Sequence, residues 1–239
     1  MQSKTSFFNR TLFRKNLSRY WPLWGFASFV GFLAPAALLV RVIQSGETSV
    51  APLRVREIYY YLVADAVPIV SLVYAILCAM AVWSYLYNPR SVGMMHSLPI
   101  RREGLFLTNL LSGLAMMAIP YLVAGVLGTL LFACCGGFDA WGTLATILAV
   151  IGQSVTFFGL ATFCAFLTGN IFALPVLYFL FNFLAPLGDW LCNLFARGFL
   201  FGFTADYSGS VDFLCPVVYL TQRLYVSSEY ETVRDSALE

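Results

Sequence analysis

The side chains that could do chemistry are few and scattered along this 239-residue chain. His96 is the only histidine, and a lone imidazole supports neither a metal site nor a catalytic pair. The sequence has no Walker A loop, Rossmann glycine pattern, serine nucleophile elbow or zinc-binding spacing. We therefore predict no catalytic residue, no metal and no cofactor. The lack of a basic array also predicts no nucleic-acid partner.

The most informative stretch, residues 84–104, has the character of a docking surface. Pro89 should end the preceding helix, because the residue before a proline avoids helical dihedral angles. Pro99 should make a second break just before the next apolar stretch. Residues 91–97, between the two prolines, are predicted to form a short helix.

Three apolar residues of this loop, Val92, Met95 and Leu98, fall on one side of the predicted short helix. Such a side suits a groove on a partner protein, and methionine adapts well to such surfaces. A plain solvated connector remains an equal alternative. The predicted partner-binding residues are Asn88, Arg90, Ser91, Val92, Met94, Met95, His96, Leu98, Arg101 and Arg102.

Residues 7–20 mix apolar and basic side chains at helical spacing. A basic amphipathic helix of this kind lies in the membrane interface, with its cations toward anionic headgroups. Tryptophans that follow it are typical interfacial anchors. A basic solvated tail is the alternative. The predicted interface residues are Arg10, Arg14, Lys15, Arg19, Trp21 and Trp24.

The predicted docking loop and interfacial helix are connected by long apolar stretches, which must hold them in position. Of all residues 60% are hydrophobic and 11% charged, whereas soluble domains carry about a quarter charged residues. A bilayer core of about 30 Å needs roughly 20 apolar helical residues, which excludes a soluble domain here. Five spans of an all-α helical bundle are predicted at 21–40, 62–87, 105–135, 140–167 and 171–188, the last continuing amphipathically past Asp189.

The charges predict a cytoplasmic N-terminus, because basic residues favour cytoplasmic loops. Eight basic residues then face the cytoplasm and six face outward, and of twelve acids only Glu103 faces inward. The cytoplasmic set is Lys4, Arg10, Arg14, Lys15, Arg19, Arg90, Arg101 and Arg102; the outer set is Arg41, Arg54, Arg56, Arg197, Arg223 and Arg234.

The predicted topology gives the expected locations of four cysteines. Cys78 and Cys164 lie inside spans, where they are expected to act as small apolar residues. Cys192 and Cys215 fall on the predicted outer side. Spacing alone leaves a disulfide between them and two free thiols both open.

The fourth and fifth spans are joined by residues 168–170 alone, which predicts antiparallel neighbours. Small residues between them are expected to allow close helix approach, and buried polar residues to tie helices together. The small residues are Gly152, Ser154, Gly159, Ala161, Ala165 and Gly169; the polar ones are Gln153, Thr156 and Asn182.

Residues 196–239 contain apolar pieces too short to span a membrane. We expect short helices in the outer leaflet, packed against the bundle. We also expect the full protein to continue into a sixth span, with a five-span protein as the alternative.

The order of these parts, together with the motif Ser97-Leu98-Pro99-Ile100-Arg101-Arg102 after a short helix, resembles the membrane subunit of type-2 ABC exporters of Gram-positive bacteria. The resemblance implies a connecting helix at 1–20, a transmembrane domain at 21–195 and outer helices at 196–239. It also implies that the loop 88–103 is a coupling helix.

This resemblance further implies a permease subunit of the cell membrane, without an ATPase site of its own. Its partners would be a separate ATP-binding-cassette ATPase subunit, a second permease chain (the same or a different one) and the lipid bilayer. Two other classes stay open: a non-transporting membrane partner, such as an immunity or signalling subunit, and a secondary transporter.

Overall fold

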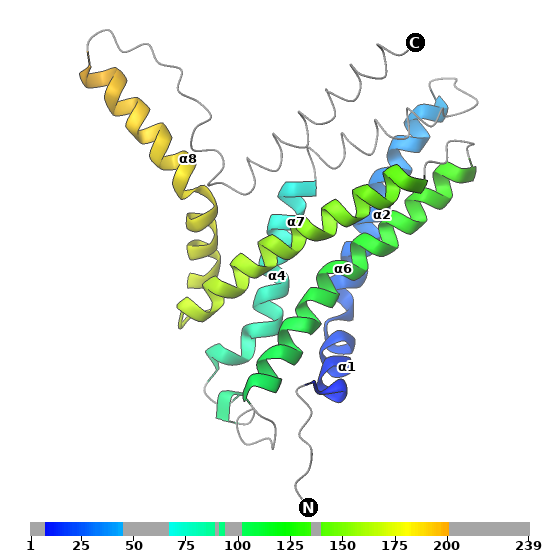
Figure 1. Cartoon of the computed structure of the whole chain (residues 1–239), viewed down its shortest axis with the longest axis horizontal. Helices are drawn as coiled ribbons and strands as arrows, with labels where there is room; N and C mark the ends of the chain where they lie inside the picture. The colour runs from blue at the N-terminus through cyan, green and yellow to red at the C-terminus, as the bar shows by residue number, and fades with distance from the viewer. Residues whose placement is uncertain (1–7, 45–66, 89–90, 94–101, 135–139, 201–239) are drawn as a thin grey trace, which may run out of the picture.

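The computed structural model describes residues 8–44, 67–88, 91–93, 102–134 and 140–200 (Figure 1). This part of the chain is helical and contains no strand, so the predicted all-α class is confirmed. The elements are α1 (Arg10–Arg19), α2 (Trp21–Gln44), α4 (Val67–Trp83), the 3-10 helix η2 (Ser84–Tyr87), α6 (Arg102–Cys134), α7 (Ala140–Leu167) and α8 (Ala173–Phe199).

Four helices within the described ranges are long and apolar enough to cross a membrane. Each exceeds the roughly 20 residues that a bilayer core requires, which indicates a membrane protein. The predicted first span falls in α2, whose apolar stretch Trp21–Ala37 is shorter, so the total of five spans stays a prediction. The four candidate spans are Val67–Tyr87, Arg102–Leu131, Leu144–Leu167 and Ala173–Phe199.

The observed helix ends differ from the predicted span ends mainly in α8. This helix begins at Ala173 and continues to Phe199, so the predicted continuation of the fifth span past Asp189 is confirmed. Asp189 does not interrupt it, because its Oδ2 accepts a hydrogen bond from Nδ2 of Asn193, one turn later, at 3.2 Å. Of the segment 196–239 predicted to form outer helices, residues 196–199 belong to α8, and residues 201–239 lie outside the described part.

Helix α4 packs against both α6 and α7, which also contact each other, while α2 runs along α6 (Figure 1). The core consists of large side chains that close the space between α4, α6, α7 and the start of α8. Both Cys78 and Cys164 lie in this core, as their predicted apolar role requires. The largest fully buried side chains are Trp83, Tyr178, Phe157, Phe158, Met116 and Met117.

A tyrosine of α4 compensates for a proline inside α6. Pro120 has no N–H, so it cannot donate to the carbonyl of Met116 four residues earlier. The Tyr74 hydroxyl donates to that Met116 carbonyl at 2.8 Å and is itself buried. An unsatisfied carbonyl is costly where water is excluded, so this bond joins α4 to α6 at the proline.

We expect Tyr74→Phe to lower the free energy of unfolding by about 1 kcal/mol, because the Met116 carbonyl loses its donor. In a Pro120→Ala background the same change should have little effect, since the backbone N–H of the introduced alanine then supplies the missing bond. Denaturant titration of the four proteins in detergent micelles measures this coupling. Equal losses in both backgrounds would contradict the compensation.

Tyrosine and serine hydroxyls make further bonds between the helices. Tyr178 of α8 donates to the Leu72 carbonyl of α4 at 3.2 Å. The hydroxyls of Ser71 and Tyr121 lie 2.7 Å apart and link α4 to α6. Tyr87 donates to the Ala165 carbonyl of α7 at 2.9 Å.

The polar residues predicted to tie helices together behave differently. Thr156 is exposed and donates to the Gly152 carbonyl of its own helix, so the prediction was wrong for it. Asn182 is buried and donates to the Tyr178 carbonyl, also on its own helix. Gln153 is buried, but neither of its amide atoms has a hydrogen-bond partner among the described residues.

The glycines predicted to allow close helix approach were the wrong ones. An added Cβ at Gly152, Gly159 or Gly169 would meet nothing within 4 Å. The close approaches occur instead on α6, at Gly113 against the Phe158 ring and at Gly125, where a Cβ would lie 2.5 Å from Ile147 Cδ1. Small side chains on α7 do lie at buried positions, namely Ser154, Ala161 and Ala165.

The turn between α7 and α8 reverses the chain, and α8 then leaves the bundle (Figure 1). Its buried residues are Leu174, Tyr178 and Asn182, one per turn over its first half. Only this half therefore packs against the bundle. Pro186 lies inside α8, which bends partway along its length, and prolines are a common cause of such kinks.

Candidate functional site

The candidate site lies at one end of the bundle, which we call the loop end. It comprises α1, η2, residues 88 and 91–93, the first turns of α6 and the turn at 168–172 (Figure 1). The structure thus brings the basic N-terminal helix and the start of α6 to the same end. The side of the membrane on which this end lies remains a prediction.

Helix α4 gives way to the predicted docking loop through η2. Asn88 is extended, with φ −113° and ψ 112°, as expected for a residue before proline. Its carbonyl accepts a hydrogen bond from the Val92 N–H at 3.0 Å, and residues 91–93 are helical. A new helical turn therefore begins just after Pro89.

The structure places four of the ten predicted partner-binding residues. Asn88 and Arg102 are exposed, at the two ends of the loop, while Ser91 and Val92 are partly buried. Because 89–90 and 94–101 lie outside the described residues, the apolar docking side stays a prediction. The residues concerned are Arg90, Met94, Met95, His96, Leu98 and Arg101.

Both ends of the loop are held by an aromatic cluster around Trp83, the last residue of α4. The Trp83 ring is fully buried and its Nε1 donates to Thr162 Oγ1 of α7 at 3.3 Å. It stacks on Phe106 of α6 with ring centroids 5.5 Å apart, and meets Phe166 of α7 edge-on at 4.8 Å. This cluster joins the end of α4, the start of α6 and the end of α7.

Helix α1 is capped and amphipathic. The Asn9 side chain is the N-cap, and its Oδ1 accepts from the backbone N–H groups of Thr11 and Leu12 at 3.0 and 3.2 Å. The helix buries Phe13 and Leu17 in part against the bundle. Its four predicted interface cations, Arg10, Arg14, Lys15 and Arg19, are exposed.

The inner side of α1 joins α6 through a polar seam, defined by Asn9, Asn16, Thr108, Asn109 and Ser112. The Asn9 backbone N–H donates to Thr108 Oγ1 at 3.1 Å. The Asn16 side chain donates to Asn109 Oδ1 at 2.8 Å and to Ser112 Oγ at 3.2 Å. The three α6 residues are buried, so the seam fixes α1 on the helix that follows the loop.

Sequence reasoning missed this polar seam. The available signal was the spacing of Thr108 and Ser112, four apart and next to Asn109 in an otherwise apolar stretch. Residues at that spacing share one helix side, which marks a polar stripe that must meet a polar partner.

The two predicted interfacial tryptophans lie in different surroundings. Trp21 is 62% exposed at the start of α2. Trp24 is partly buried, and its Nε1 donates to the Leu17 carbonyl at 3.1 Å. Trp24 therefore also fixes the angle between α1 and α2.

The remaining chemistry of the described residues is sparse. No group of three or more His, Cys, Asp or Glu side chains within these residues could hold a metal ion. Cys192 is exposed on α8, while Cys215 lies outside the described part, so a disulfide between them and two free thiols both stay open.

No family model, curated protein or solved structure matches this chain. Its function must therefore be argued from the loop end itself.

Proposed function

We propose that this chain is the permease subunit of an ATP-binding-cassette exporter of the type-2 class. The loop 88–103 would dock a separate ATPase subunit on the cytoplasmic side of the cell membrane. A second permease chain would complete the translocation path. ATP binding would close the ATPase subunits, and their motion would pass through the loop into the helices.

The observation that carries this proposal is the aromatic cluster around Trp83. A docking loop can transmit motion only if its ends are fixed to elements that must move. Trp83 contacts Phe106 and Phe166 and hydrogen-bonds to Thr162, so three helices converge at the loop. A force on the loop would therefore displace α4, α6 and α7 together rather than bend a loose connector.

The polar seam supplies a second point of transmission. Helix α1 is bonded to the first turns of α6 by Asn9 and Asn16. A partner that contacts α1 would therefore act on the same helix that receives the loop. This arrangement favours a mechanical role for the loop end over the alternative interpretation, in which the loop is a plain solvated connector.

Co-purification with an ATPase subunit tests the proposal. The full chain would be expressed with ATP-binding-cassette ATPase subunits of its own genome, and binding and ATP hydrolysis measured in detergent. The double change Met95→Asp and Leu98→Asp should weaken binding at least about tenfold, because it places charges on the apolar docking side.

The matched control is Phe138→Asp in the connection between α6 and α7, at the opposite end of these helices. It adds the same kind of charge to a loop and should leave binding unchanged. If no ATPase subunit binds, a non-transporting membrane partner or a secondary transporter becomes the better account. Binding that survives the double change would contradict the docking role of the loop.

A further inference from the structure

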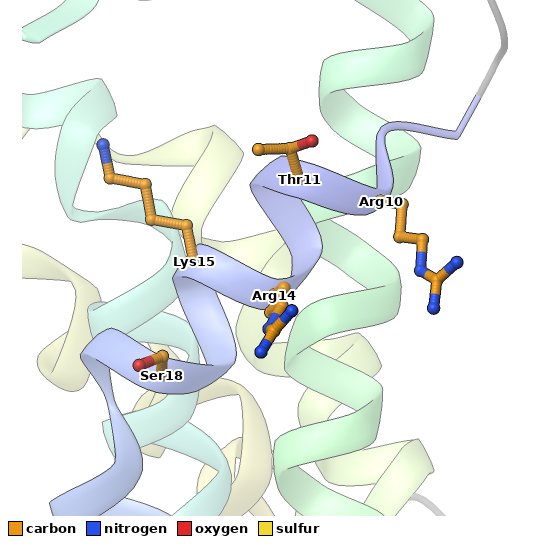
Figure 2. Close-up of a pocket in the computed structure, with 5 residues that line it drawn as sticks. All are labelled: Arg10, Thr11, Arg14, Lys15 and Ser18. Atoms are coloured by element: carbon orange, nitrogen blue, oxygen red, sulfur yellow. The ribbon is translucent and has the colours of Figure 1, made fainter.

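An open groove of about 460 Å³ lies along the outward side of α1. Five side chains line it, and they project from successive turns on one side of the helix, with the other helices behind (Figure 2). At 100° per residue they cover roughly 140° of the helix circumference. The lining residues are Arg10, Thr11, Arg14, Lys15 and Ser18.

The three cations of this groove have no acidic partner among the described residues. The neighbouring sequence offers none either, since the first acidic residue of the chain is Glu47. One of them, Arg10, stands in the first turn of α1, where the helix dipole favours anions over cations. This placement works against helix stability, and a bound anion would reverse that effect.

The hydroxyls specify the kind of anion. Around the helix, Thr11 and Ser18 fall between Arg14 and Lys15, so hydroxyl donors lie between guanidinium and ammonium groups. A phosphate group has several acceptor oxygens and suits this mixture, because arginine binds it with two parallel bonds and lysine as a point charge. A single carboxylate would use fewer of the donors.

The depth of the groove indicates where the phosphate comes from. Helix α1 ends at Arg19, and the apolar helix α2 begins at Trp21, which is 62% exposed. Exposed tryptophan at the start of an apolar helix is typical of the headgroup layer of a membrane. The groove therefore lies at the level of lipid phosphates, one helical turn or two from the hydrocarbon.

We propose that the α1 groove is a binding site for the phosphate of one anionic phospholipid. Arg10 and Arg14 hold the phosphate oxygens from one side and Lys15 from the other, while Thr11 donates between them; Ser18, roughly 10 Å further along the helix, contacts the rest of the headgroup. The site does not depend on the proposed transport function. It differs from general attraction to an anionic surface in its single-lipid stoichiometry and its dependence on particular residues.

Native mass spectrometry of the full chain tests this site, with phosphatidylglycerol added in a mild detergent. One phosphatidylglycerol should be retained per chain in preference to phosphatidylcholine. Arg14→Gln should lower its affinity about fivefold, and the pair Thr11→Ala and Ser18→Ala about threefold. Arg14→Lys should recover part of the loss, because it restores the charge without the two parallel bonds.

Arg19→Gln is the matched control, because it removes the same charge from the same helix. Arg19 does not line the groove, and its guanidinium lies over the Tyr20 ring at 5.5 Å. Its change should lower lipid affinity less than twofold. Equal losses for the Arg14 and Arg19 variants would overturn the site in favour of diffuse attraction, and so would no loss for either.

A competition experiment separates the two sources of phosphate. Inorganic phosphate at millimolar concentration should leave the retained phosphatidylglycerol in place, since the lipid tail adds membrane attachment. If inorganic phosphate displaces phosphatidylglycerol when the two are present at the same concentration, the groove is a site for soluble anions and the lipid proposal fails. A thermal melt of each variant, expected to match the unaltered chain, shows that these surface changes leave the fold intact.

Discussion

Replacing Trp83 with alanine should be the most damaging single truncation in the described part of the chain. The side chain is 0% exposed and is the largest of the fully buried residues. Its removal leaves a cavity between α4, α6 and α7 and leaves Thr162 Oγ1 without its indole donor. We expect the free energy of unfolding to fall by about 3 kcal/mol, and most of this loss comes from the cavity and the lost packing contacts. Loss of apolar burial contributes less, because the lipid around the protein is itself apolar.

Denaturant titration in detergent micelles, followed by circular dichroism, measures this loss. Trp141→Ala is the matched control: Trp141 is 80% exposed at the start of α7, so its change should stay within about 0.5 kcal/mol. Trp83→Phe should cost less, about 1–2 kcal/mol, since it keeps a six-membered ring but loses the bond to Thr162 and part of the indole volume. Equal losses at 83 and 141 would show that Trp83 does not join the helices.

The Trp83 change also bears on function. In the proposed permease, the cluster around Trp83 transmits motion from the docking loop to the helices. Trp83→Phe, which should still fold, is expected to keep ATPase-subunit binding and to lose part of any substrate stimulation of ATP hydrolysis. A variant that loses binding as well would show that Trp83 maintains the shape of the docking surface, which would contradict a role in transmission alone.

Gly113→Ala and Gly152→Ala are expected to change stability in opposite directions. At Gly113 a Cβ would overlap the ring of Phe158, which is fully buried. Overpacking of this kind costs about 1–3 kcal/mol. At Gly152 the space is open, so alanine should stabilise the helix by up to about 1 kcal/mol, its advantage in helix propensity.

A second substitution should restore part of the stability that Gly113→Ala removes. Combining Gly113→Ala with Phe158→Leu shortens the facing side chain and should restore part of the lost stability, as expected for residues in contact. The free energies of unfolding of both single variants and the double variant give the coupling. Additive losses, or stabilisation by Gly113→Ala alone, would contradict the close contact between α6 and α7.

The helical class and most span positions could be predicted, because they depend on where charges are missing. The fourth predicted span, 140–167, has the same bounds as α7. The break after η2 was also predictable, since Pro89 restricts Asn88 whatever surrounds it. These features depend on the local chain and on the thickness of a bilayer.

Features that depend on which helix side meets which neighbour could not be predicted. In a membrane helix both the lipid-facing and the packed sides are apolar, so the pattern does not mark the inner side. Gly152 and Gly113 look alike in sequence, yet only Gly113 meets a facing ring. The bond from Tyr74 to the Met116 carbonyl was equally hidden, because Pro120 predicts an unpaired carbonyl but not its donor.

The candidate site was predicted in part, for a related reason. The cations of α1 and the ends of the loop are visible in the sequence as charges and prolines. The polar seam needs a pairing between residues such as Asn16 and Asn109, 93 positions apart, which no local pattern encodes. The continuation of α8 past Asp189 was predictable from its amphipathic pattern, whereas the bond from Asn193 to Asp189 inside the helix was not.

The central claim is that the loop end faces the cytoplasm, where an ATPase subunit could reach it. Cysteine labelling in intact cells tests this most directly, in a variant that keeps only the buried Cys78 and Cys164. A membrane-impermeant maleimide should label His96→Cys only after the cells are opened, and Thr48→Cys, in the predicted outer loop, without opening. Labelling at position 96 in intact cells would contradict the account.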